Sequence, residues 1–398
     1  MKIAIVSDLH LGYERFEEDA FAQAKDALEQ ASKQADAILI PGDIFDKRYP
    51  RPEVISQAIN IFRELSKRKW GASISESTKE LHTKVPIIAI PGTHERIAEG
   101  KENAVKLLSL AGLLADTSES TTTIQKGEEK VSVFGLGGLS EEMVKERLSE
   151  LSPKPLAGTF SIFMFHQSLY EMLPYSENFI RYSDLPKGFD LYVCGHMHSP
   201  QEAKVHNKKL LIPGSTVLTQ LKGEEQSTKG FIIFDTSDNS HRFISINSRP
   251  YVMRAIEIKD GKPSELAELC DREISKAISV QKDKPIVRIK INGSMARGFD
   301  KADLQIHSLM SKYSGKAFLT IDTTQLTSPG TELLIEGVRD GKIDDMSVKE
   351  LGLITLSAKL KEANSDKSIN YTELFNLLSG QPNKDKAIRA AMELLSEK

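Results

Sequence analysis

The first 250 residues alternate short apolar runs with helical segments, and this alternation limits the possible folds more than any other feature. The runs "KIAIVSD" at 2–8, "DAILIPGD" at 36–43 and "VPIIAIPG" at 85–92 are typical of buried strands. Helical patterns at 17–33 and 52–68 separate them, and the second opens on a proline that suits a first helical turn. This order of elements predicts parallel strands covered by helices.

The later strand patterns lie closer together, so we expect part of the sheet to be antiparallel. One more helix is predicted at 102–114, and the polar run at 116–123 is interpreted as a turn region. The later strands are predicted at 130–136, 159–165, 189–194, 209–213 and 230–235.

A chain of 398 residues is too long for one ordinary domain, so we expect several. A proline near residue 250 separates two strand-like runs, which makes 1–249 the first predicted domain. Residues 250–325 show a strand–helix–strand–helix–strand pattern, which predicts a small α+β domain. The segment 326–345 is rich in Thr, Ser, Pro, Gly and Asp, as linkers are. Two short helices are predicted within 346–398.

Polar side chains follow five of the predicted strands, at the point where each strand ends. Ligands of open α/β sheets bind outside the carboxyl ends of the strands, so these side chains are expected to lie together. In chain order they are Asp8, His10, Asp43, Asp46, Thr93, His94, Glu95, His166, His196 and His198.

Five of the nine histidines occupy these turns, and carboxylates combined with imidazoles suit Mn²⁺, Fe²⁺ or Zn²⁺. Asp8 and His10 are two residues apart and so point to one face of an extended segment, as do His196 and His198. Asp43 is placed to bridge two ions, and two ions about 3.5–4 Å apart can activate water and hold a phosphoryl group. Each turn alone is ordinary, because turns favour Gly and Asp. The ordered set predicts a metal site.

The ordered set resembles the calcineurin-like metallophosphoesterase superfamily. More narrowly, "SDLHLG", "GDIFD", "FHQ" and "GHMHSPQ" resemble the double-strand-break repair nucleases, which comprise the archaeal and eukaryotic meiotic-recombination-eleven nucleases and bacterial SbcD. The resemblance covers residues 1–250, and by element order 250–325 resembles the capping domain of that family. It implies an α/β fold: a metallophosphoesterase β-sandwich with flanking helices, a small α+β capping domain and a helical C-terminal tail.

The resemblance also implies roles for single residues and two Mn²⁺ ions per chain. His94 would be catalytic, because it would face the scissile phosphate and stabilise charge or protonate the leaving oxygen. The residues implied for the first metal site are Asp8, His10, Asp43 and His198. The residues implied for the second metal site are Asp43, His166 and His196.

Two positions depart from the family pattern. Where the family has an Asn ligand in G-N-H-[DE], this chain has Thr93, whose single neutral oxygen sits on a shorter arm. We expect a weaker second site, and the alternative is that Thr93 only supports the turn and one metal binds. Many members have His where this chain has Asp46. Asp46 either binds metal-bound water or a histidine of the site, or it only caps the turn.

Overall charge neither suggests nor excludes a nucleic-acid partner, because the net charge is −3 and the pI is near 6.4. A local basic surface is predicted in the 250–325 domain, with a solvated strand face as the alternative. The residues predicted to meet DNA phosphates are Arg288, Lys290, Arg297 and Lys301.

The resemblance further implies protein partners. The helices of 346–398 resemble the segment that docks on the coiled-coil ABC-type ATPase of the family, although they can equally pack on their own domain. A homodimer is implied, for which the helices at 52–68 and 102–112 are candidates, and their apolar stripes are equally suited to covering the sheet.

The sequence favours a reducing, cytoplasmic location. Cys194 and Cys270 lie far apart and offer neither a disulfide framework nor a zinc site. The first ten residues are polar too early for a signal peptide, and no run approaches the roughly 18 apolar residues of a membrane span.

These observations lead to one main hypothesis and two alternatives. The main hypothesis is a Mn²⁺-dependent DNA exonuclease and endonuclease that works with an ATPase in double-strand-break repair. The first alternative is a metallophosphodiesterase acting on nucleotides or other phosphoesters, because a metal site does not name its substrate. The second is a DNA-end-binding scaffold whose second metal site has decayed through Thr93.

Overall fold

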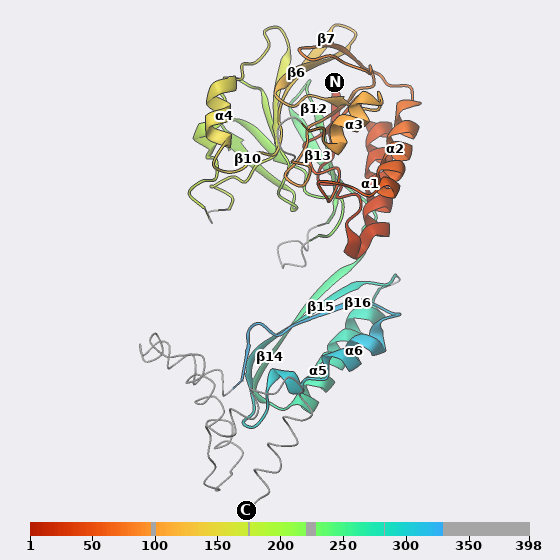
Figure 1. The fold of residues 1–398 in the computed structure, drawn as a ribbon, viewed down its shortest axis with the longest axis vertical. Coiled ribbons are helices and arrows are strands. Elements are labelled where there is room, and N and C mark those ends of the chain that lie inside the picture. Colours follow the sequence, from red (N-terminus) through yellow and green to blue (C-terminus); the bar gives the residue numbers. More distant parts are fainter. Residues whose placement is uncertain (97–100, 174–175, 220–227, 282, 329–398) are drawn as a thin grey trace, which may run out of the picture. The chain divides into compact units, whose positions relative to one another are not determined.

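The computed structural model describes residues 1–96, 101–173, 176–219, 228–281 and 283–328. The chain divides into two compact units, Met1–Ser248 and Arg249–Lys398 (Figure 1). The predicted helices of 346–398 and nearly all of the predicted linker at 326–345 lie outside the described residues.

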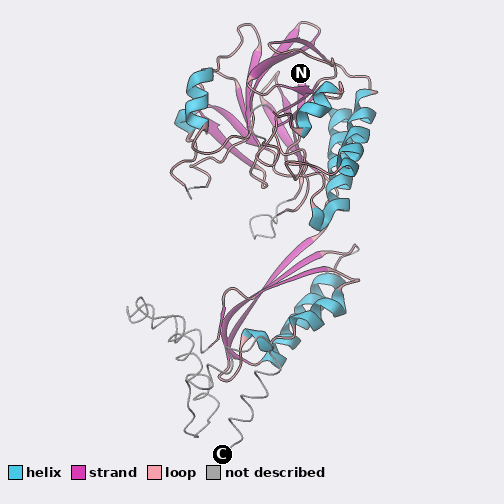
Figure 2. Ribbon diagram, in the orientation of Figure 1, coloured by secondary structure: helices cyan, strands magenta, loops and turns pink. Residues whose placement is uncertain are grey.

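The first unit contains two β-sheets and the helices that cover them (Figure 2). The strands of the first sheet are β1 (Lys2–Ile5), β2 (Ala37–Ile40), β4 (Ile87–Ala89), β5 (Ala115–Asp116), β12 (Gly230–Asp235) and β13 (Ser240–Ser245). The strands of the second are β3 (Ser73–Ser77), β6 (Ser120–Lys126), β7 (Glu129–Leu136), β8 (Phe160–Phe165), β9 (Leu191–Cys194), β10 (Gln201–Val205) and β11 (Lys208–Ile212). The helices are α1 (Glu17–Gln34), α2 (Pro52–Ser66), α3 (Ala104–Leu110) and α4 (Val144–Leu151).

The strand order is β13-β12-β1-β2-β4-β5 in the six-stranded sheet and β10-β11-β9-β8-β7-β6-β3 in the seven-stranded sheet. β1, β2, β4 and β5 are parallel, whereas β12 runs antiparallel to β1. β7, β8, β9 and β11 are likewise parallel, with antiparallel strands at both edges of their sheet. The predicted mixture of parallel and antiparallel pairing is therefore present in both sheets.

Alternation along the strands builds three apolar layers. Ile3 and Ile5 of β1 pack in the core between the two sheets, whereas Ala4 packs in the core beneath α1, α2 and α3. On the far side of the seven-stranded sheet, Phe163 and Val144 share a third core with the loops around β9. The first unit is thus a β-sandwich with helices on both outer faces, as predicted (Figure 1).

The sequence interpretation of 116–123 as a turn region was wrong in part. Residues from Ser120 onward form β6, the partner of both β3 and β7. Thr122 and Thr123 are buried, and Thr122 Oγ1 donates a hydrogen bond to Thr117 Oγ1 at 3.1 Å. The strand has a polar sequence because its buried hydroxyl groups form hydrogen bonds inside the sheet. In the sequence alone, such a polar run resembles a turn.

The second unit holds a parallel sheet covered on one face by two helices. Its described elements are β14 (Tyr251–Gly261), α5 (Pro263–Ser279), β15 (Ile286–Met295), α6 (Ile306–Tyr313), β16 (Phe318–Asp322) and β17 (Leu326–Thr327). β15 pairs in parallel with β14, β16 and β17. This is the predicted strand and helix order of the α+β domain, and β17 extends the sheet into the first residues of the segment predicted as a linker.

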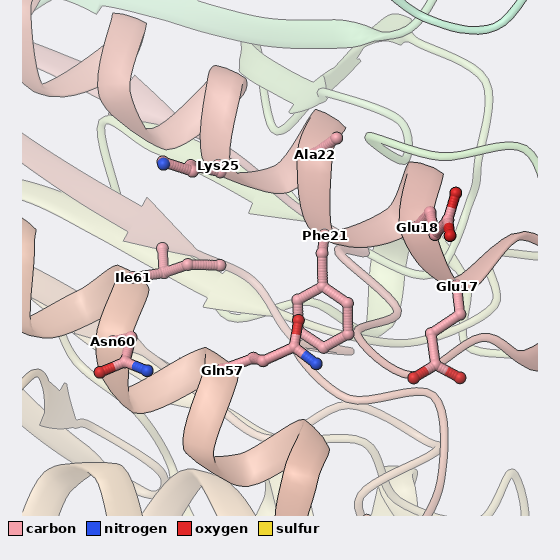
Figure 3. Close-up of a pocket in the computed structure, with 8 residues that line it drawn as sticks. All are labelled: Glu17, Glu18, Phe21, Ala22, Lys25, Gln57, Asn60 and Ile61. Atoms are coloured by element: carbon pink, nitrogen blue, oxygen red, sulfur yellow. The ribbon is translucent and has the colours of Figure 1, made fainter.

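A cavity of about 710 Å³ opens between α1 and α2 and contains none of the polar strand-end residues (Figure 3). Its lining residues are Glu17, Glu18, Phe21, Ala22, Lys25, Gln57, Asn60 and Ile61. Val54, Ala58 and Phe62 of α2 pack in the core against the six-stranded sheet. The buried stripe of α2 therefore covers its own sheet.

Candidate metal centre

The polar strand ends of both sheets meet at one place. Three groups of side chains lie there, and within each group the potential ligand atoms are all within 4.8 Å of one another. Two of the groups contain residues from both sheets, so the site forms where the carboxyl ends of the two sets of parallel strands converge. The groups are Asp8–His10–His198, His10–Asp43–His94 and Asp43–His166–His196.

In the first group, two imidazoles face one buried carboxylate. His10 Nε2 lies 3.1 Å from His198 Nε2, and His198 Nε2 lies 3.7 Å from Asp8 Oδ1. Asp8 Oδ1 also accepts a hydrogen bond from the His196 backbone N–H at 3.2 Å. Thr219 Oγ1 lies 2.6 Å from His198 Nδ1, which leaves Nε2 as the nitrogen directed at the centre.

In the third group, His166 Nε2 lies 3.2 Å from Asp43 Oδ2, and both side chains are buried. Pro41 O accepts from His166 Nδ1 at 2.7 Å, so the lone pair of Nε2 points at the carboxylate in the neutral ring. Among the described residues, His166 Nε2 and His10 Nδ1 are buried nitrogens without a hydrogen-bond partner. An unpaired imidazole nitrogen facing a carboxylate oxygen is a donor set that fits a divalent cation.

Charge in the site also fits a cation. Burial acts to lower the pKa of His166, but Asp43 and Asp8 overcome it and raise this pKa to about 9. Burial acts to raise the pKa of Asp43, but His166 and the other imidazoles hold it well below its usual range. Burial and His166 lower the pKa of His196 to about 3. Without metal, a proton on His166 thus supplies positive charge that a bound cation would replace.

The His10–Asp43–His94 group joins the other two, because Asp43 and His10 each belong to two groups. His94 differs from the other histidines of the site in that 45% of its side chain is exposed. Its backbone N–H donates to Asp43 Oδ1 at 2.9 Å, and its Nδ1 lies 2.6 Å from Asp46 O. His94 is therefore held at the rim of the site with Nε2 available to a substrate.

Comparison with known proteins agrees with this geometry. The sequence profile of the calcineurin-like phosphoesterases matches residues 1–200, which is half of the chain. The chain belongs to the calcineurin-like phosphoesterase family. The predicted superfamily and the predicted metal-dependent phosphoesterase chemistry are thereby confirmed, and this family membership indicates that a divalent metal binds.

Relatives within this phosphoesterase family confirm the narrower resemblance. The chain is 26% identical to a protein of Saccharolobus solfataricus over 96% of its own length and 99% of that protein. It is 26% identical to a protein of Sulfolobus acidocaldarius, covering 74% of this chain and 76% of the relative. Both relatives are named DNA double-strand break repair protein Mre11. The human double-strand break repair protein MRE11 is 24% identical, and the match spans half of its length.

The phosphoesterase site holds several of its residues in strained backbone conformations. Asp8, His10, Asp43 and His196 all have positive φ, at 53°, 45°, 51° and 78°. Non-glycine residues adopt this region at a cost of about 1–3 kcal/mol each, and such residues cluster at functional sites. A Cβ on Gly92 would lie 2.1 Å from Asp43 Oδ1, so only glycine fits beside this carboxylate.

The two positions that depart from the family pattern both contact the site. Thr93 Oγ1 donates to Asp43 Oδ2 at 3.5 Å, a long hydrogen bond that keeps the hydroxyl beside this carboxylate. Asp46 Oδ1 lies 3.3 Å from His10 Nδ1, and the Asp46 side chain is largely buried. Asp46 thus faces the nitrogen of His10 that points away from His198.

We predict that Asp46→Ala weakens binding of a divalent metal about 10–100-fold, the usual effect of removing a carboxylate that orients a ligating histidine, as His10 is predicted to be. The Asp46 backbone carbonyl that contacts His94 is retained in this variant. The loss of metal affinity would therefore come from the missing contact with His10. Calorimetric titration of metal-free protein with Mn²⁺ measures it. Asp238→Ala, at an exposed carboxylate in the turn after β12, is the matched control. An unchanged affinity in Asp46→Ala would leave Asp46 as a turn residue only.

Glu95 belongs to the predicted set of polar strand-end residues, but no role for it was predicted from the sequence. Its side chain is fully buried, and its two oxygens accept from the backbone N–H groups of Phe45 and Gly92 at 2.7 Å each. Burial and the nearby Asp43 raise the pKa of Glu95 to about 8, and the two N–H donors oppose this shift. Glu95 ties the turn after β2 to the turn after β4, and its place next to His94 was the signal available in the sequence.

The four predicted DNA-contacting residues lie in the second unit. Arg288 is in an ion pair with Asp322, and Lys290 lies opposite Asp322 in the register of β15 and β16. Arg297 is exposed in the turn after β15, and Lys301 lies in a short 3₁₀ turn, Lys301–Asp303. Arg297 is thus the most accessible of the four.

In the described part of the chain, each helix is too short or too polar to cross a membrane.

Proposed function

We propose that this phosphoesterase is a Mn²⁺-dependent DNA nuclease that binds two metal ions and hydrolyses phosphodiester bonds. The observation that carries the proposal is the sharing of Asp43 between two groups of potential ligands. A shared carboxylate suits a pair of ions close enough to act on one phosphoryl group. DNA as the substrate is supported by the relatives named Mre11, one of which matches along nearly its whole length.

Each residue of the site has a distinct task in this proposal. Bound ions would supply Lewis-acid stabilisation of the phosphoryl charge and a more acidic water. Asp8, His10, Asp43 and His198 would hold one ion, whereas Asp43, His166 and His196 would hold the second, with Asp43 shared between them. His94 would act on the substrate itself. Its contact with Asp46 O places a proton on Nδ1, so the imidazolium form can give the proton on Nε2 to the leaving oxygen.

The cellular role proposed is processing of DNA double-strand breaks by exonuclease and endonuclease cleavage. The protein would act with a coiled-coil ABC-type ATPase that binds residues 346–398, and as a homodimer. Residues 250–325 would form the capping domain, with Arg297 and Lys301 offering the accessible cations for DNA phosphates. Support for these roles comes from the resemblance to the Mre11 relatives.

The test combines metal stoichiometry with activity on one preparation. Mn²⁺ is titrated into metal-free protein while the cleavage of double-stranded DNA, single-stranded DNA and bis-p-nitrophenyl phosphate is followed. Two ions per chain together with DNA cleavage is the expected result. Turnover of the small ester without DNA cleavage would favour a phosphodiesterase of small substrates. DNA binding without cleavage in excess Mn²⁺ would favour the alternative of a DNA-end-binding scaffold, in which the second metal site has decayed through Thr93.

We predict that Thr93→Asn strengthens binding of the second ion by about 10-fold, because the amide oxygen reaches further than the hydroxyl and adds a ligand beside Asp43. Thr93→Val is the matched control, since it keeps the shape and removes the oxygen. A weaker second ion in Thr93→Val would show that the hydroxyl takes part in binding. Equal affinities in all three proteins would mean that Thr93 supports the turn alone.

A further inference from the structure

Lys229 is a buried lysine close to the proposed metal centre. Only 1% of the residue is exposed, although an ammonium group strongly prefers water. Its Nζ donates to the backbone carbonyl of His198 at 3.1 Å and to Ser215 Oγ at 2.8 Å. Lysine is seldom buried without a specific task, so the groups that it contacts indicate what it does.

Lys229 contacts one potential metal ligand directly and is linked to a second through the loop after β11. The carbonyl of His198 also accepts from the backbone N–H of Ser215 at 3.2 Å, so the lysine and the loop after β11 hold the same peptide group. The next residue of that loop, Thr216, donates its backbone N–H to Asp8 O at 3.3 Å. One network thus joins Lys229 to the backbones of His198 and Asp8.

This network also joins the two sheets. Lys229 immediately precedes β12 of the six-stranded sheet, whereas His198 and Ser215 follow β9 and β11 of the seven-stranded sheet. The group Asp8–His10–His198 takes ligands from both sheets, so its geometry depends on how the sheets are held together at this edge. A flexible side chain with three donors can fix a carbonyl and a hydroxyl at the same time.

We propose that Lys229 is a positioning residue that fixes His198 relative to Asp8 and so sets the metal affinity of their group. The proposal rests on the proposed function, because it assumes that this group binds Mn²⁺. Lys229 itself reaches the ligands through backbone atoms and a hydroxyl, and it carries the same charge as the metal. It therefore acts by holding the ligands in place.

The experiment compares wild type with Lys229→Met, which keeps the length of the side chain and removes the ammonium. Mn²⁺ affinity is measured by electron paramagnetic resonance on metal-free protein, in wild type and in a His166→Ala background that disables the other group. We expect the dissociation constant at the Asp8–His10–His198 group to rise about 10–100-fold in Lys229→Met. Hydrolysis of bis-p-nitrophenyl phosphate should fall at limiting Mn²⁺ and recover at saturating Mn²⁺.

Recovery at high Mn²⁺ separates a positioning role from a loss of folding. The control is Ile124→Ala, which removes apolar contact from the core between the sheets and lowers Tm without touching this network. Unchanged Mn²⁺ affinity in Lys229→Met, or an equal loss in Ile124→Ala, would overturn the proposal. If Lys229→Met does not fold, Ser215→Ala removes one acceptor of the lysine, and wild-type affinity in that variant would overturn it equally. A wild type that binds no Mn²⁺ would instead refute the proposed function.

Discussion

Asp43→Asn is expected to weaken binding of both ions of the proposed Mn²⁺ pair and to reduce phosphodiester cleavage by at least about 10²–10³-fold. The substitution keeps the size of the side chain and removes its charge. Asp43 belongs to two of the three ligand groups, and its oxygens lie 3.2 Å from His166 Nε2 and 2.9 Å from the His94 backbone N–H. A neutral amide would leave both ions without their shared anionic ligand and would turn an N–H group toward a cation.

The measurement is Mn²⁺ stoichiometry by calorimetry and cleavage of DNA under the same conditions. Asp190→Asn is the matched control, because Asp190 is a half-buried carboxylate that accepts from the Ser161 backbone N–H at 3.0 Å, at the start of β9 rather than its end. This control should bind two ions and cleave normally. If Asp43→Asn retained both ions and cleaved within about tenfold of wild type, Asp43 would not be the shared ligand.

The convergence of the polar strand ends could be predicted from the sequence, because it follows from local rules. Apolar runs separated by helices give parallel strands, and parallel strands send their carboxyl ends to one edge. Asp8, Asp43 and His166 each follow such a run, and the structure brings them together. The sequence also indicated a mixture of parallel and antiparallel strands, because the later strands lie closer together.

The pairing of distant segments could not be predicted in the same way. β6 has a polar sequence, and its hydroxyl groups are satisfied only by residues that the fold brings next to it. Lys229 looks like an ordinary surface residue in the sequence, and Glu95 stands out only as one of the polar strand-end residues. Both are buried, and their partners include residues 31 and 50 positions away, His198 and Phe45. Local composition carries no information on such partners, because burial of a charged group is decided by tertiary contacts.

His94→Ala is expected to leave Mn²⁺ binding largely intact and to reduce DNA cleavage by about 10²–10⁴-fold, the contribution of a positioned acid–base group. The histidine is the most exposed of the ring groups at the site, and its Nδ1 is engaged by Asp46 O. The two other members of its ligand group, His10 and Asp43, keep their ligand atoms in this variant. His94→Ala should therefore lose DNA cleavage and keep Mn²⁺ binding, whereas Asp43→Asn should lose both.

The separation is measured by Mn²⁺ titration and single-turnover cleavage of DNA by the same protein. His82→Ala, at an exposed histidine outside the three ligand groups, should match wild type in both measurements. An acid that protonates the leaving oxygen matters less when the leaving group is already stable as an anion. Cleavage of bis-p-nitrophenyl phosphate should consequently fall less than cleavage of DNA in His94→Ala. An equal fall on both substrates would assign His94 to stabilisation of phosphoryl charge, and normal DNA cleavage would remove it from the mechanism.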